Sequence, residues 1–101
     1  MSNQNLYELS TQELDAFLQK HPEWKVMGDH NFLVRVYNLK SYFKGLNFLQ
    51  NIGWQAQKHN HHPDLTLTFS QLTCSLTTHD IGNKISNRDI FFAELIEKSW
   101  F

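Results

Sequence analysis

Cysteine and proline are scarce in this chain, and it has no long hydrophobic run. The 101 residues include one cysteine, Cys74, and two prolines, Pro22 and Pro63. A single cysteine excludes an internal disulfide and is typical of proteins in reducing compartments. No apolar run approaches the roughly 20 residues that span a bilayer, and the first residues lack the basic and apolar regions of a secretory signal. We therefore expect a cytoplasmic protein with no membrane contact.

An excess of charge of either sign is also missing. Nine lysines and arginines stand against ten aspartates and glutamates, which leaves a net charge of −1. Chains that coat nucleic acid or anionic membranes carry a clear basic excess, so we expect neither partner. The length and the 41% hydrophobic content are typical of one small globular domain covering residues 1–101.

Local patterns predict three helices and two β-hairpins. The first and last helices begin at capping boxes, Ser10 with Glu13 and Ser86 with Asp89. A helical apolar period predicts a long helix over residues 41–60. Alternation of apolar and polar residues predicts strands at 24–27, 32–37, 65–69 and 72–77.

The predicted element order, α-β-β-α-β-β-α, indicates the α+β class. We expect a four-stranded antiparallel sheet with three helices packed on one face. Phe69, at the end of the third strand, is expected in the core. The apolar stripe of the long helix is broad enough to bury a second side against a partner chain. That stripe consists of Phe43, Leu46, Leu49, Ile52 and Ala56, widened by Tyr42, Phe48 and Trp54.

Three histidines stand where predicted elements end. His61 and His62 follow the long helix, and Pro63 keeps them out of a helix interior. His79 follows the fourth strand. If the third and fourth strands form a hairpin, residues before one and after the other are neighbours. The three imidazoles are therefore expected at one end of the sheet.

These histidines have three possible interpretations: solvated loop side chains, metal ligands, or acid–base groups. The spacing matches no known zinc pattern, so we expect no metal and no cofactor. Histidine donates and accepts protons near neutral pH, and each proton transfer by a positioned side chain accelerates a reaction by ~10²–10⁴. The metal interpretation would draw on His59, His61, His62 and His79 with Asp64 or Asp80.

A longer pattern includes these histidines. Five residues separate Pro63 from Phe69. Nine residues separate Phe69 from His79, and nine more separate His79 from Asp89. This pattern resembles the signature of the pterin-4a-carbinolamine dehydratases, and the similar element order extends the resemblance over most of the chain. The pattern consists of Gln57, His61, His62, Pro63, Phe69, His79 and Asp89.

The resemblance implies a hydro-lyase that needs no metal or cofactor. Its substrate would be 4a-hydroxytetrahydrobiopterin or a related 4a-hydroxytetrahydropterin, made by an aromatic amino acid hydroxylase and returned to the tetrahydrobiopterin cycle as quinonoid dihydropterin. His61 and His79 match the family's acid–base histidines, and His62 matches the histidine that orients the pterin. The resemblance also implies a homodimer or homotetramer.

Further substrate contacts are expected from Pro63, Asp89, Gln57 and Asn60. Gln57 and Asn60 depart from the family's pattern, because charged side chains are usual there; an amide still hydrogen-bonds but adds no charge. Asp89 is also the third residue of a capping box, and we favour that structural role for it. Lys58 is expected on solvated helix surface, as is His59.

A second class of function stays open on the same scaffold. Relatives of the family act as a dimerisation cofactor for a transcription factor, or as assembly chaperones for a carbon-fixing enzyme. Such roles would not require His61, His62 and His79 together, so their joint presence favours the enzyme. A small metal-binding protein is the third and weakest hypothesis.

Overall fold

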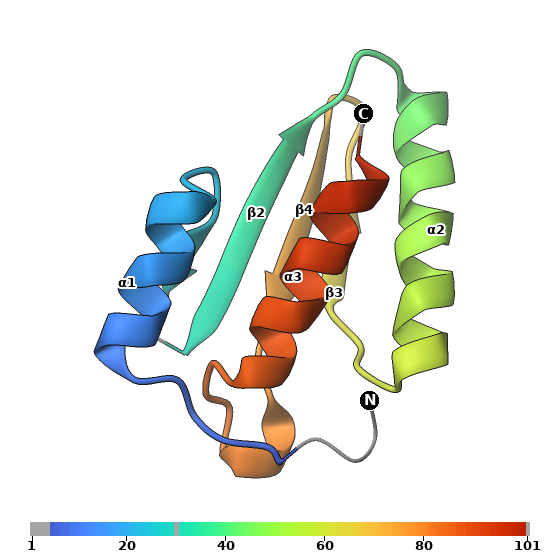
Figure 1. Cartoon of the computed structure of the whole chain (residues 1–101). Helices are drawn as coiled ribbons and strands as arrows, with labels where there is room; N and C mark the ends of the chain where they lie inside the picture. The colour runs from blue at the N-terminus through green and yellow to red at the C-terminus, as the bar shows by residue number, and fades with distance from the viewer. Residues whose placement is uncertain (1–4, 30, 101) are drawn as a thin grey trace.

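The computed structural model describes residues 5–29 and 31–100. Residues 1–4, which begin the stretch where we expected no secretory signal, lie outside the described residues. Within this part, the predicted order α-β-β-α-β-β-α and the α+β class are confirmed (Figure 1). A short 3₁₀ helix, η1 (His79–Ile81), was not predicted. The other elements are α1 (Thr11–Lys20), β1 (Lys25–Met27), β2 (Phe32–Asn38), α2 (Tyr42–His59), β3 (Asp64–Leu67), β4 (Gln71–Leu76) and α3 (Asn87–Ser99).

The four strands form one antiparallel sheet in the order β1-β2-β4-β3. All three helices lie across one face of it, as predicted (Figure 1). Leu33 pairs with Leu76 and Tyr37 with Leu72, and these side chains are buried under the helices. Since successive strand residues point to opposite faces, Val36 lies on the uncovered face, where it is exposed.

Both predicted capping boxes are present. Ser10 Oγ accepts the Glu13 N–H, and Glu13 Oε1 accepts the Ser10 N–H at 2.9 Å. That backbone N–H holds the pKa of Glu13 below its usual value. Ser86 and Asp89 make the equivalent box at α3, so both helices begin where the sequence indicated.

Glu97 of α3 explains why the charged residue Arg35 lies on the helix-covered face of β2. Glu97 Oε1 accepts hydrogen bonds from Arg35 Nε (2.9 Å), Tyr37 Oη (2.7 Å) and Trp24 Nε1 (3.0 Å). Burial, and then the bond to Glu97, raise the pKa of Tyr37. Because the phenol stays protonated, it donates its hydrogen bond to Glu97. One carboxylate thus connects α3 to β2 and to Trp24, the residue just before β1.

The prediction that Phe69 lies in the core is wrong. Strand β3 ends at Leu67, and the Thr68 N–H donates to the Gln71 carbonyl at 2.8 Å. This bond closes a turn two residues earlier than the alternation indicated. Phe69 therefore lies at the turn, with 83% of its surface exposed.

The predicted stripe of α2 is only partly buried. The helix packs on the sheet through Gly45, Phe48, Ile52 and Ala56. Phe43 is 71% exposed and Leu46 is also exposed. The helix thus has a second, uncovered apolar side.

None of the described helices is long and apolar enough to cross a membrane.

Cys74 is fully buried on the covered face of β4, and burial raises the pKa of its thiol from 9.0 to about 12. Above its unfolded pKa the thiol ionises in the unfolded chain but stays protonated in the folded one, so stability falls as pH rises through this window. We expect the free energy of unfolding to fall by about 2 kcal/mol between pH ~7 and pH ~10.5 from this group.

Urea unfolding of the wild type and of Cys74→Ala at both pH values measures this contribution. The alanine variant lacks the thiol, so its fall with pH should be smaller by the same amount. Equal falls in both proteins would exclude Cys74 as the source.

Candidate active site

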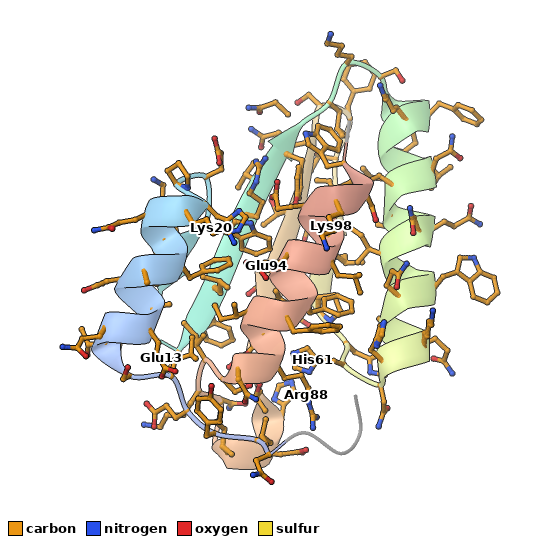
Figure 2. All side chains as sticks on the ribbon, in the orientation of Figure 1. Glu13, Lys20, His61, Arg88, Glu94 and Lys98 are labelled. Carbon is orange, nitrogen blue, oxygen red and sulfur yellow. The ribbon has the colours of Figure 1, made fainter. Side chains whose placement is uncertain are left out.

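Two adjoining cavities open where α2 and β4 end. The histidine cavity, about 400 Å³, is lined by residues 60–64, 77–80 and 88. The basic cavity, about 570 Å³, is lined by residues 58–61, 80, 88, 91 and 92. They share Asn60, His61, Asp80 and Arg88. Figure 2 shows His61 and Arg88 close to the start of α3.

The C-terminus of α2 determines where His61 and His62 point. Asn60 adopts the left-handed conformation with φ of 51°, and its N–H bonds to the Ala56 carbonyl. The His61 N–H bonds to the same carbonyl at 3.1 Å. The chain then turns toward β3, which leaves His61 only 7% exposed while His62 is exposed in the histidine cavity.

Asn60 therefore has a conformational role besides lining the cavities. Asparagine tolerates a positive φ, whereas a β-branched residue there is strained. We expect Asn60→Val to lower the free energy of unfolding by about 1–2 kcal/mol. Asn60→Gly, the matched control, should cost less because glycine adopts this φ freely. Equal losses of unfolding free energy in the two variants, measured by urea unfolding, would show that the left-handed conformation of residue 60 is not the reason for the loss.

Asp89 holds the ring of His61 in place through a hydrogen bond with Nε2. Its carboxylate is fully buried; Oδ1 lies 2.6 Å from His61 Nε2, and Oδ2 accepts from Thr78 Oγ1 (2.8 Å) and the Ser86 N–H (2.9 Å). A carboxylate only accepts hydrogen bonds, so His61 donates from Nε2. The capping role that we favoured for Asp89 is thus present, together with a contact to His61 that the sequence argument did not weigh.

The second ring nitrogen of His61 is left for the cavity. With Nε2 protonated, the lone pair of the neutral ring lies on Nδ1. Nδ1 has no hydrogen-bond partner among the described residues, and no buried side-chain nitrogen or oxygen of these residues lacks a partner. Nδ1 therefore reaches the surface of the cavity, where it can accept a proton.

His79 also lines the histidine cavity, at the start of η1. Its Nδ1 is 2.6 Å from Asn83 Oδ1. With that amide oxygen as acceptor, the ring carries a proton on Nδ1, and Nε2 is available for proton exchange. The side chain of His79 is exposed.

The other expected contacts divide into two groups. Pro63 and Asn60 line the histidine cavity, whereas Gln57 is exposed on α2 and lines neither cavity. Lys58 and His59, which we expected on solvated helix surface, line the basic cavity. Within the described residues, no three or more His, Cys, Asp or Glu side chains are grouped to hold a metal ion.

The sequence argument did not single out Arg88, which lines both cavities. Arg88 directly precedes Asp89, the last residue of the pattern. That position was the only signal in the sequence that could have identified it. The ring of His59 packs edge-on against Phe91 of α3, with centroids 5.4 Å apart. This contact brings the end of α2 and the start of α3 together around the basic cavity.

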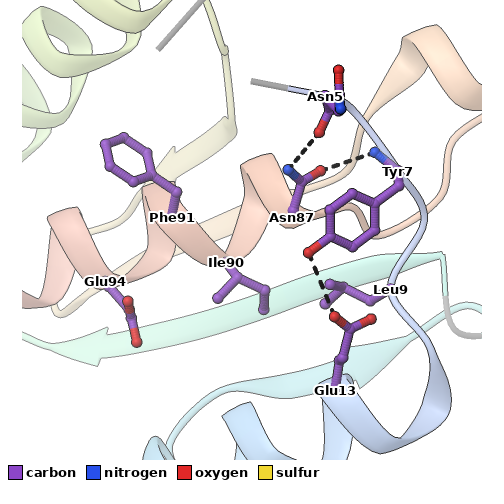
Figure 3. Close-up of a pocket in the computed structure, with 8 residues that line it drawn as sticks. All are labelled: Asn5, Tyr7, Leu9, Glu13, Asn87, Ile90, Phe91 and Glu94. Atoms are coloured by element: carbon purple, nitrogen blue, oxygen red, sulfur yellow. Dashed lines mark hydrogen bonds between the residues drawn. The ribbon is translucent and has the colours of Figure 1, made fainter. Parts of the chain in front are cut away.

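A third cavity, about 550 Å³, lies between the N-terminal segment, α1 and α3 (Figure 3). None of the histidines that the structure describes lines it. Asn87 Oδ1 accepts the Tyr7 N–H at 3.0 Å, and Asn87 Nδ2 donates to the Asn5 carbonyl at 2.8 Å. These bonds hold the N-terminal segment against the start of α3, beside Ser86 and Asp89, and so support the histidine cavity from outside.

Comparison with known proteins finds similarity over nearly all of the chain. Residues 7–99 match the family model described as "Pterin 4 alpha carbinolamine dehydratase". A relative from Alkaliphilus metalliredigens is 36% identical over 91 residues, 89% of this chain and 80% of its own length. One from Thermosynechococcus vestitus is 34% identical over 88 residues, 87% of this chain and 90% of its own. Both are named "Putative pterin-4-alpha-carbinolamine dehydratase".

A solved structure has the same fold. The crystal structure of "transcriptional coactivator/pterin dehydratase" from Brucella melitensis superimposes with a TM-score of 0.84, covering 91% of this chain and 97% of that one. The two sequences are 21% identical, so this similarity concerns the fold alone. The family match and the two relatives carry the assignment: the chain belongs to the pterin-4-alpha-carbinolamine dehydratase family.

Proposed function

We propose that this protein dehydrates a 4a-hydroxytetrahydropterin to the quinonoid dihydropterin and water. The observation that carries the proposal is the buried 2.6 Å contact between Asp89 and His61 Nε2. It leaves Nδ1 without a partner among the described residues, in a histidine that lines one cavity together with His62 and His79. A cavity of about 400 Å³ lies in the size range of small-molecule sites.

The reaction requires one proton to be removed and one to be delivered. The lone pair of the pterin N5 expels the 4a-hydroxyl, so the C4a–O bond breaks and a C4a=N5 double bond forms. One histidine takes a proton from a ring nitrogen, and another gives a proton to the departing hydroxyl, which leaves as water. Atoms and charges balance without an external oxidant or reductant.

We assign the basic role to His61 and the acidic role to His79. Asp89 fixes the tautomer of His61 and stabilises the imidazolium that forms when Nδ1 accepts a proton. His79, held by Asn83 and open to water, donates from Nε2 when it is protonated. His62, exposed at the rim, is placed to hydrogen-bond and orient the ring.

In this proposal the substrate comes from an aromatic amino acid hydroxylase, and the product returns to tetrahydrobiopterin recycling. The single, buried cysteine of the chain, Cys74, is compatible with the reducing cytoplasm where we place this cycle. The 4a-hydroxytetrahydropterin also loses water without a catalyst, so the protein's role is to raise that rate.

The test is dehydration over many turnovers with a chelator present. We expect substoichiometric protein to accelerate the loss of 4a-hydroxytetrahydropterin, followed by ultraviolet absorbance, as fast with chelator as without. No acceleration under either condition would favour the non-catalytic dimerisation or assembly cofactor instead. Acceleration abolished by the chelator would contradict proton transfer by histidines alone.

We also propose that the chain forms a homodimer or homotetramer. The uncovered side of α2 exposes Tyr42, Phe43, Leu46 and Trp54, and Trp54 is 72% exposed. Large exposed apolar patches mark interaction surfaces, and residues 45–57 contain no charged side chain that would oppose contact between two copies. Light scattering should give a mass above 12.0 kDa, reduced in Trp54→Glu; a monomeric wild type would contradict this.

A further inference from the structure

We propose that the basic cavity is a subsite for a phosphate ester on the side chain of the pterin, with Lys58 and Arg88 as the residues that set this specificity. The inference rests on the proposed dehydratase function, because it takes the ring to lie in the histidine cavity. It goes beyond that function by naming the class of substrate: a reduced pterin whose side chain ends in phosphate.

The basic cavity has two cations that are not fully neutralised. The Lys58 ammonium has no hydrogen-bond or ion-pair partner among the described residues. Arg88 Nη1 lies 3.9 Å from Asp80 Oδ2, and the side chain of Asp80 is 74% exposed. A long, solvated ion pair contributes little, so the guanidinium can turn from Asp80 to a ligand.

Two positive charges against one carboxylate leave the lining with a formal charge of +1, before His59 and His61 are counted. The nearby carboxylate of Asp89 does not line the cavity, and it is satisfied by hydrogen bonds from His61, Thr78 and Ser86. A phosphate monoester carries about −1.5 to −2 charges at neutral pH. It therefore suits Lys58 as a point charge and Arg88 as a planar fork.

The position of the cavity fits a side chain rather than a separate ligand. It shares Asn60, His61, Asp80 and Arg88 with the histidine cavity, so a substituent on a ring between His61 and His79 can extend past His61 into it. Phe91 and Phe92 provide an apolar wall along the way. Lys58 lines only the basic cavity and Arg88 lines both, so the two cations can select substrates while the proton transfers are assigned to His61 and His79.

Binding of dihydropterins tests the subsite without the reaction, because these compounds have no 4a-hydroxyl to lose. The probes are 7,8-dihydroneopterin, with a neutral side chain, and its 3′-monophosphate, measured by calorimetry. We expect the wild type to bind the phosphate about tenfold more tightly, which corresponds to about 1.4 kcal/mol. Added salt should reduce this preference, because it screens charges at the surface.

Lys58→Gln and Arg88→Gln should each lower the preference for the phosphate severalfold. Lys98→Gln, which removes an exposed cation at the far end of α3, is the matched control and should keep it. Lys58 lies on exposed helix surface, so its variant reports on binding even if Arg88→Gln disturbs the start of α3.

The outcomes separate this inference from the proposed function. Equal affinity of the wild type for both probes would overturn the subsite and leave the dehydratase proposal standing. An unchanged preference in both glutamine variants would also overturn it. If neither probe binds, the ring site in the histidine cavity fails as well.

Discussion

Replacement of His61 by alanine is expected to lower the rate of dehydration by about 10²-fold or more, and His79→Ala should do the same. In the proposed mechanism, His61→Ala removes the nitrogen that accepts the ring proton, and His79→Ala removes the group that donates to the departing hydroxyl. Since both transfers occur in one reaction, neither remaining histidine can supply both. Stopped-flow absorbance of 4a-hydroxytetrahydropterin measures each rate against the uncatalysed reaction.

His59→Ala is the matched control for these variants. His59 lies two residues before His61 and lines only the basic cavity, so its loss should change the rate of a neutral-chain substrate far less. Circular dichroism and urea unfolding show whether each variant is folded. A folded His61→Ala that retains the full rate would remove His61 from the mechanism.

Replacement of Asp89 by alanine is expected to lower the free energy of unfolding by about 3 kcal/mol. The change leaves the His61 N–H, the Thr78 hydroxyl and the Ser86 N–H without their acceptor. Each such buried donor costs about 1 kcal/mol or more. Urea unfolding of Asp89→Ala measures the loss.

Asp89→Asn separates the structural role of this carboxylate from its role beside His61. An amide oxygen keeps one acceptor, so stability should fall less than in the alanine variant. With its oxygen accepting from Thr78 and Ser86, the amide turns its NH2 group toward His61 Nε2 and cannot accept the proton there, and an amide has no charge to stabilise an imidazolium. The dehydration rate should therefore fall by about 10²-fold. Asp80→Asn, a neighbouring exposed carboxylate, should stay within ~0.5 kcal/mol of the wild type. A stable, fully active Asp89→Asn would leave Asp89 only its capping role.

Much of the fold could be predicted because its signals are local. The capping boxes at Ser10 and Ser86 depend on residues three positions apart, and strand alternation depends on the next residue. The order β1-β2-β4-β3 depends instead on pairing between strands that are far apart in the sequence. The largely covered position of Arg35 depends on its contact with Glu97, 62 residues away. Phe69 was misplaced because one backbone bond of Thr68 ends β3 earlier than the alternation does.

The candidate site also has parts that local sequence signals predict and parts that depend on long-range contacts. The hairpin of β3 and β4 brings His61, His62 and His79 to one cavity, a consequence of strand pairing that the sequence indicated. The roles of Lys58 and Arg88 depend on how the end of α2 meets the start of α3, and no pattern within either helix reports that. Gln57 fits the motif by its position in the sequence, but the helix turns it toward solvent.

The most direct measurement is the rate of quinonoid dihydropterin formation with wild-type protein and with the folded double variant His61→Ala/His79→Ala. We expect the wild type to exceed the uncatalysed rate over many turnovers, and the double variant to return to it. A wild-type rate equal to that of buffer, or a double variant as fast as the wild type, would contradict proton transfer in the histidine cavity.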